Sequence, residues 1–221
     1  MMAGAMGRFV CVEGIDGAGK TLIAGEVVAR LRAEGVNAAL VSRDSVAADE
    51  GAAKRLRILT ELLWGYDARD AIQRLGHRHL ILLMASWFDL FHRWIVAPAL
   101  AGHQVTVTDQ SPCKYIARFH ALGRTCADGL FDQLIAPDLV LLLGVDPALA
   151  ASRKPGLKPT ECGTEARNDL AAFIAFQSAV AERLRRLRNP AWREIDASAP
   201  AAIVATSAVE AVRSIIGPGT S

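Results

Sequence analysis

The sequence predicts an α/β fold in which a parallel β-sheet is covered by helices on both faces. Short apolar runs rich in β-branched residues alternate with longer segments whose apolar residues recur at helical spacing. A glycine-rich turn separates the first run from the first helical segment. Strands that alternate with helices favour a parallel sheet, because each connection places a helix against the sheet. With 221 residues and 52% hydrophobic composition, one domain over residues 1–221 is expected.

The strands are expected where short apolar runs end at glycine, proline or polar residues. Four such runs lie at residues 8–13, 38–42, 105–108 and 139–143, and a fifth strand is expected at residues 192–195. Helical spacing marks residues 20–34, 47–64, about 70–100, 114–136, 170–187 and 200–216. Breaks are expected within the fourth helix near Gly123 and Gly129. Residues 152–163 hold three basic residues, two prolines and two glycines without periodicity, which indicates a mobile loop.

Charge and cysteine usage exclude several classes of protein. The 25 Lys and Arg residues nearly balance the 23 Asp and Glu residues, so no global field favours a nucleic-acid polymer or an anionic membrane. The four cysteines are widely separated and lack metal-ligand spacing, which argues against a zinc site or a disulfide framework. The first residues do not resemble a signal peptide, and we expect a cytoplasmic protein.

One apolar segment, residues 80–100, has to be distinguished from a membrane span. Asp89, His92, Arg93 and Pro98 interrupt it, and charged residues are costly within a bilayer. A buried or dimer-forming helix is therefore the preferred interpretation.

A phosphate-binding motif follows the first expected strand. The run Gly14-Ile15-Asp16-Gly17-Ala18-Gly19-Lys20-Thr21 matches GxxxxGK[ST] in full and opens the first expected helix. The glycines let successive N–H groups converge on phosphate oxygens at the positive end of a helix. Lys20 adds a charge and the Thr21 hydroxyl can bind Mg²⁺, so ATP and Mg²⁺ are the expected ligands.

A carboxylate follows the third expected strand. In a parallel sheet the carboxyl end of this strand lies beside the phosphate loop, where Mg²⁺ needs an acceptor. Asp109, at this position, is the candidate second metal ligand. The alternative is a helix cap or turn residue.

The first motif, residues 9–21, resembles that of the thymidylate kinase family, in which a Glu-Gly pair precedes a Gly-Ala-Gly-Lys turn. The resemblance continues at Arg43-Asp44-Ser45, which stands where the family has Arg-Glu-Pro, and at Asp109-Gln110-Ser111, where it has Asp-Arg-Tyr. Residues 137–147 resemble its fourth strand and residues 195–198 its adenine-side loop. The resemblance implies a three-layer P-loop NTPase fold with sheet order 2-3-1-4-5. It also implies a lid at about 152–163 and a homodimer packed through the helix within 70–100.

The resemblance also implies roles for individual residues. Asp16 would face the sugar hydroxyl of the acceptor, Arg43 the acceptor phosphate and Arg153 the adenine of ATP. The expected nucleotide-binding set is Gly14, Asp16, Gly17, Ala18, Gly19, Lys20, Thr21, Arg153 and Ser198. The expected catalytic residues are Lys20, Asp109, Arg43 and Arg153, and the expected metal ligands are Thr21 and Asp109. Some family members carry an arginine at the position of Gly17, so the lid would have to supply that charge. Its available cations are Arg153, Lys154 and Lys158, of which Lys154 and Lys158 could equally belong to a solvated face.

Several departures from the family concern the acceptor. Gln110 replaces an arginine, exchanging a charged bidentate phosphate clamp for a neutral amide. Phe88 stands where the family has a base-contacting arginine, and Arg118 and Phe119 replace a Tyr-Gln pair. Lys114 and Arg118 share one helical face and could bind an anion in place of the missing arginine. The alternative is two exposed cations on a surface helix.

These observations predict an ATP-dependent kinase of a nucleoside monophosphate, with dTMP as the default acceptor. The expected acceptor-binding residues are Asp16, Arg43, Phe88, Gln110, Lys114, Arg118 and Phe119. A kinase of a different small acceptor and a non-catalytic nucleotide-binding homologue stay open as alternatives. A switch GTPase is disfavoured because the sequence lacks an Asn-Lys-x-Asp motif.

Overall fold

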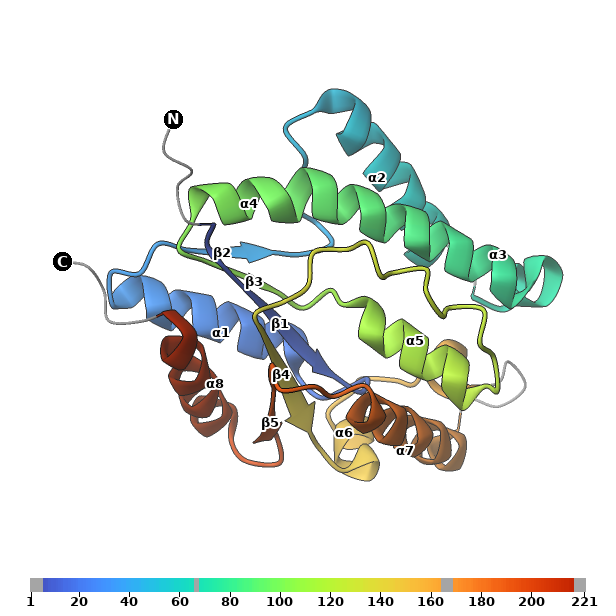
Figure 1. Ribbon diagram of the computed structural model, residues 1–221. Helices are drawn as coiled ribbons and strands as arrows, with labels where there is room; N and C mark the ends of the chain where they lie inside the picture. Colours follow the sequence, from blue (N-terminus) through green and yellow to red (C-terminus); the bar gives the residue numbers. More distant parts are fainter. Residues whose placement is uncertain (1–5, 66–67, 164–168, 217–221) are drawn as a thin grey trace.

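The computed structural model of the chain describes residues 6–65, 68–163 and 169–216, with the backbone alone for residues 68–74. Its strands are β1 (Arg8–Gly14), β2 (Ala38–Val41), β3 (Val105–Thr108), β4 (Leu139–Gly144) and β5 (Trp192–Asp196). They pair in parallel in the order β2-β3-β1-β4-β5, as Figure 1 shows. The predicted sheet order is therefore confirmed.

Helices cover both faces of this sheet. They are α1 (Lys20–Ala33), α2 (Glu50–Trp64), α3 (Ala68–Phe91), the π-helix η1 (His92–Val96), α4 (Ala97–Gly102), α5 (Pro112–Ala121), α6 (Pro147–Ser152), the 3-10 turn η2 (Pro159–Glu161), α7 (Leu170–Arg186) and α8 (Ala201–Ile216). Helices α1 and α8 pack together on one face, while α4 and α5 contact the other and α7 packs on α5 (Figure 1). Because all five strands are parallel, their carboxyl ends lie at one edge of the sheet, where open α/β folds bind ligands.

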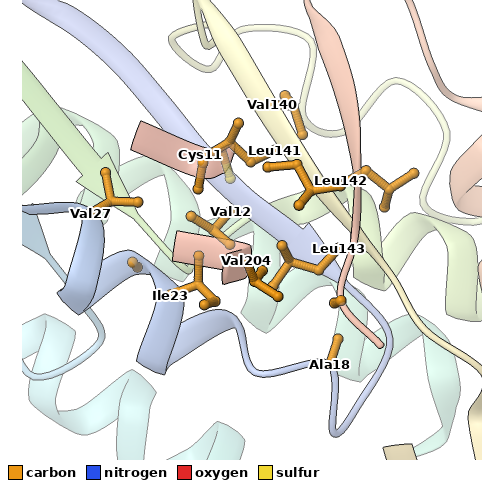
Figure 2. Close-up of a cluster of buried hydrophobic side chains, with 14 of the residues drawn as sticks. Cys11, Val12, Ala18, Ile23, Val27, Val140, Leu141, Leu142, Leu143 and Val204 are labelled. Carbon is orange, nitrogen blue, oxygen red and sulfur yellow. The ribbon is translucent and has the colours of Figure 1, made fainter. Parts of the chain in front are cut away.

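The first core cluster joins the central strands to the helices on either side. Strand β4 is buried along all but its last residue, because both of its faces are covered. Figure 2 shows Ile23 and Val27 of α1 and Val204 of α8 gathered against β1 and β4. Fully burying one such aliphatic side chain contributes about 1.5–3 kcal/mol. The cluster thereby holds the start of α1, and with it the phosphate loop, in a fixed place on the sheet.

A second, aromatic cluster attaches α2 and α3 to the sheet. Trp87 and Phe91 of α3 stack with ring centroids 4.7 Å apart, and Phe88 meets Phe131 edge to face at 5.7 Å. Phe9 of β1 belongs to the same cluster. Aromatic pairs of this kind stabilise a core beyond their buried area.

The long helix expected at about 70–100 is interrupted at two places. Gly76 has φ 80° and ψ 163°, a non-helical conformation that kinks α3. Further along, η1 separates α3 from α4. Pro98 lacks an N–H group and its ring crowds the carbonyl four residues earlier, which accounts for the altered hydrogen bonding of that turn. Residues 75–102 are long and apolar enough to cross a membrane, yet this helix supplies much of the second core cluster.

Two other expectations are corrected. The helix predicted over residues 114–136 starts at Pro112, behind the N-cap Ser111, and ends at Ala121. Gly123 follows with φ 69°, and residues 126–133 form turns instead of a helix. The expected loop 152–163 contains η2 and the last residue of α6. It is therefore partly ordered by its own short elements.

Candidate active site

The phosphate loop connects β1 to α1 at the carboxyl edge of the sheet. Gly17 has φ 84° and lies against α6, where an added Cβ would stand 2.4 Å from the Ala150 carbonyl oxygen. Gly19 has φ 92° immediately before the first turn of α1. Because the first N–H groups of a helix have no partner within it, this turn presents donors to an anion. The loop can therefore hold the phosphates of a nucleotide.

Two charged groups, the partly buried Lys20 and the buried Glu13, lie against the loop. The Lys20 ammonium donates to the carbonyl oxygens of Gly14 and Ile15 at 3.0 and 2.9 Å. Burial, followed by the nearby Lys114, lowers the pKa of Lys20 to about 8, so the ammonium is charged at neutral pH. The buried Glu13 carboxylate accepts from the Gly14 N–H at 2.8 Å, and burial raises its pKa. Glu13 thus fixes the start of the loop, a role that the Glu-Gly pair alone did not disclose.

The expected metal ligands meet at the end of β3. The Thr21 hydroxyl donates to Asp109 Oδ2 at 2.5 Å, and the Gln110 side chain donates to the other carboxylate oxygen at 2.8 Å. Mg²⁺ favours hard oxygen ligands and is commonly held by one or two protein groups together with phosphate oxygens and water. This hydroxyl and carboxylate fit such a site. Among the described residues, no group of three or more His, Cys, Asp or Glu could hold a metal, so phosphate and water would complete the ligand shell.

Asp16, the carboxylate predicted to face the acceptor, is held by two cations. Lys114 Nζ lies 2.7 Å from Asp16 Oδ1, and Arg118 Nη1 lies 3.2 Å from Oδ2. Burial alone would raise the pKa of Asp16, but Lys114 and Arg118 outweigh it and hold the pKa well below its ordinary value. The Lys114 and Arg118 side chains are only 15% and 17% exposed, so they are not free surface cations. In this structure the anion that they bind is the protein's own Asp16.

A side chain that the sequence analysis did not single out completes this group. Gln177 of α7 is fully buried, and its amide nitrogen lies 3.2 Å from Asp16 Oδ2 and 2.7 Å from the Glu161 carbonyl oxygen. Its amide oxygen accepts from the Asp16 N–H at 3.1 Å. No motif marks a glutamine within an amphipathic helix, and only the packing of α7 beside the loop brings it here. We call Asp16, Lys114, Arg118 and Gln177 the Asp16 cluster.

The lid contacts both the Asp16 cluster and the end of β5. Arg118 donates to the carbonyl oxygen of Thr160 in η2, and Lys154 forms an ion pair with Glu161 at 3.1 Å. Arg153, at the end of α6, donates to the Ala197 carbonyl oxygen at 2.8 Å. This bond places Arg153 beside the loop predicted to face adenine. Lys154, in contrast, is engaged by its acidic neighbour instead of being free.

A groove of about 610 Å³ opens near that loop. It lies at the ends of β4 and β5 beside α7, and Ser198 is among its lining residues. The Ser198 hydroxyl donates to Asp196 at 2.6 Å.

The remaining predicted site residues lie apart from the loop contacts. Arg43 is exposed in the loop after β2, with its guanidinium 5.2 Å from the centroid of the Trp64 ring. Phe88 is fully buried in the second core cluster, and Phe119 is 4% exposed there. The structure therefore gathers the phosphate, metal and Asp16 groups, whereas Arg43 stacks on α2 and the two phenylalanines lie within the core.

Comparison with known proteins points to one family. Residues 12–208 match the family model described as Thymidylate kinase. A thymidylate kinase from Cereibacter sphaeroides (strain ATCC 17029 / ATH 2.4.9) is 30% identical over 189 residues, covering 82% of this chain and 80% of that protein. A thymidylate kinase from Synechococcus sp. (strain RCC307) is 29% identical over 205 residues, covering 88% of this chain and 90% of that protein.

Proposed function

Because the chain belongs to the thymidylate kinase family, we propose that it transfers the γ-phosphoryl group of ATP to dTMP, giving dTDP and ADP. The observation that carries this proposal is the complete phosphate loop with Thr21 and Asp109 joined at 2.5 Å beside it. Family membership makes the chain a phosphotransferase, and neither alternative function has a specific observation in its favour.

The donor side follows from the loop geometry. An oxygen of the acceptor phosphate attacks the γ-phosphorus, the bond from that phosphorus to the β,γ-bridging oxygen breaks, and ADP leaves with the electron pair. Lys20 and the first N–H groups of α1 neutralise charge on the phosphates. Thr21 and Asp109 would hold Mg²⁺, which when bound neutralises the β- and γ-oxygens. Arg153 would meet the adenine and act on the donor, a role supported by its bond to the Ala197 carbonyl oxygen.

The acceptor would bind between the loop and the ends of β2 and β3. Arg43 is proposed to leave its stacking contact on Trp64 and bind the acceptor phosphate, with Gln110 as a neutral hydrogen-bond partner. Asp16, Lys114 and Arg118 would face the sugar. The second core cluster, through Phe88 and Phe119, would form the apolar floor beneath the base.

The setting of this activity is also part of the proposal. A kinase that acts on free nucleotides and ATP would work in the cytoplasm as one domain, without a nucleic-acid polymer or membrane. A homodimer through the helix within 70–100 would cover apolar side chains that the chain leaves exposed there, such as Leu82, which is 47% exposed.

A coupled assay of ADP release with ATP, Mg²⁺ and dTMP tests the proposal directly. The wild type should release ADP only when dTMP is present, and Lys20→Ala should abolish transfer because it removes the charge at the phosphates. Near-normal turnover of Lys20→Ala would contradict the mechanism.

A panel of other nucleotides and nucleosides separates the alternatives. Turnover confined to another acceptor would indicate a different kinase. If no compound on the panel supports ADP release, while Mg-ATP still raises the Tm, the chain would be a non-catalytic homologue. If calorimetric titration finds no Mg-ATP binding at millimolar ligand, the proposal fails entirely.

A further inference from the structure

One buried amide connects three parts of the molecule that the sequence places far apart. Gln177 lies in the middle of α7, yet it contacts Asp16 of the phosphate loop and the Glu161 carbonyl of the lid. Its side chain is fully buried. Buried amides that satisfy several partners at once tend to specify one arrangement of the surrounding elements.

We propose that Gln177 is a positioning residue that couples docking of the lid to the conformation of the phosphate loop. This inference rests on the proposed kinase function for its kinetic consequence, but the physical coupling is a property of the protein alone. A ligand that requires the docked lid would then bind more weakly whenever Gln177 cannot make its contacts.

The orientation of the amide is determined by its surroundings. The oxygen faces the Asp16 N–H, which can only donate, and the nitrogen faces a carboxylate and a carbonyl, which can only accept. A reversed amide would oppose like groups at all three contacts. Both amide protons and one oxygen lone pair are therefore used, and the lid and loop are both bound by the same planar group.

Because of the contact between Gln177 and the loop, some backbone N–H groups of the loop bond within the protein, while others remain available for phosphate. The Asp16 N–H donates to the Gln177 amide oxygen, and the Ala18 N–H donates to the Ile15 carbonyl oxygen at 3.2 Å. The donors at the start of α1 remain for phosphate. Fixing Asp16 in this way holds the curl of the loop that the phosphates require.

The contact to the lid acts on η2. Its turn is closed by bonds from the N–H groups of Glu161 and Cys162 to the carbonyl oxygens of Lys158 and Pro159, at 2.9 and 3.0 Å. Arg118 and Gln177 donate to two carbonyl oxygens of the same turn, those of Thr160 and Glu161. If the lid must be docked for ATP to bind productively, the apparent affinity falls in proportion to the docked fraction.

The principal test uses Gln177→Met, which keeps the length and approximate volume of the side chain and loses every hydrogen bond. Without substrate, hydrogen exchange at the amides of Asp16, Glu161 and Cys162 should accelerate by about tenfold relative to the wild type. In the coupled assay, KM for ATP should rise about five- to twentyfold, a larger change than that in kcat.

Gln177→Glu provides a second variant with a distinct signature. When ionised, its carboxylate still accepts from the Asp16 N–H, but it cannot donate to the Glu161 carbonyl oxygen and it opposes Asp16 Oδ2. Exchange should therefore accelerate at Glu161 and Cys162 while the Asp16 amide stays protected. Protonation at low pH restores a donor, so the excess exchange of the lid amides over wild type should shrink as pH is lowered.

Thr60→Val serves as the matched control. It removes one partly buried hydrogen bond, from Trp87 to Thr60 at 2.9 Å, in the second core cluster. It should lower the Tm without changing lid exchange or KM for ATP.

The coupling would be overturned if Gln177→Met exchanged its Asp16 and lid amides at the wild-type rate. Its only change would then be a loss of Tm like that of Thr60→Val. Because exchange is measured without substrate, this result is separable from failure of the proposed function, which would appear as absent dTMP-dependent turnover in the wild type. If Gln177→Met does not fold, the same exchange comparison with Gln177→Glu decides the question.

Discussion

Within the phosphate loop, two buried charges are controlled by their neighbours in opposite ways. Lys114 and Arg118 keep Asp16 ionised throughout the neutral range. Lys20, by contrast, lies where burial and Lys114 lower its pKa to about 8. The charge of Lys20 can thus be removed by a small rise in pH, whereas a fall in pH within the neutral range leaves Asp16 ionised.

This difference predicts how ATP binding depends on pH. Lys20 is protonated below pH 8 and neutral above it in the free protein, so Kd for Mg-ATP should be constant from pH 7 to about 8. Above about pH 8, Kd should rise, approaching a tenfold increase per pH unit. Calorimetric titration between pH 7 and 9.5 measures this. Lys20→Met should bind weakly with no such inflection, and a flat wild-type profile would contradict the assignment.

Gln110 carries a second prediction at the residue scale. Gln110→Arg should lower KM for dTMP by about tenfold, because a charged fork binds phosphate more strongly than a neutral amide. Steady-state kinetics with dTMP checks this, with Gln110→Met as the control that supplies neither charge nor donor. If Gln110→Arg leaves KM unchanged, the acceptor phosphate does not lie beside residue 110.

At the scale of single elements, the helix that follows α2 is the least regular part of the fold. His92 begins the π-turn η1 and is 5% exposed, and neither ring nitrogen has a hydrogen-bond partner among the described residues. Burial lowers its pKa to about 4, with Asp89 opposing the shift. The ring is therefore neutral in the folded protein at every pH above that value.

Because His92 is buried in a neutral state, the free energy of unfolding should depend on pH. The unfolded chain protonates His92 near pH 6.5 and the folded chain only near pH 4, so the unfolded state gains protons first as pH falls. This group's contribution is complete above pH 6.5, and about 3 kcal/mol is lost by pH 4. Urea unfolding of wild type and His92→Phe across this range tests the idea. The variant should lose less stability on acidification, and parallel curves would contradict it.

At the scale of the whole molecule, several apolar side chains on α2, α3 and η1 are exposed. Besides Leu82, Trp94 of η1 is 38% exposed and Leu62 of α2 is 49% exposed. Single exposed apolar residues are ordinary, but several on adjacent helices favour an interface.

The proposed dimer can be tested by sedimentation. Wild type should sediment as a dimer, and Leu82→Glu should shift it to monomer because the new carboxylate would be desolvated in the interface. Ile203→Glu, which adds the same charge at a 56% exposed position on α8, should leave the dimer intact. A wild-type monomer at micromolar concentration would contradict the assignment.

Sequence patterns predicted most of the sheet because β1 to β4 are short, largely apolar runs and the helices between them have periodic apolar residues, and both are local properties. The prediction that the fourth helix reaches residue 136 was wrong, also for a local reason. Gly123 ends α5 in a left-handed conformation, and the apolar residues beyond it, such as Phe131, pack into the second cluster from turns. Their spacing imitated a helix without one being formed.

By itself, the sequence determined the phosphate loop and the carboxylate at its side, because these features follow from consecutive residues and from the geometry of parallel strands. The strand order came from the family resemblance. Only the tertiary structure decided what the charges near the loop bind. Lys114 and Arg118 reach Asp16 across about a hundred residues of chain, and Gln177 joins them from α7, because helices on one face of the sheet converge there. Contacts between distant segments depend on packing, which no local pattern records.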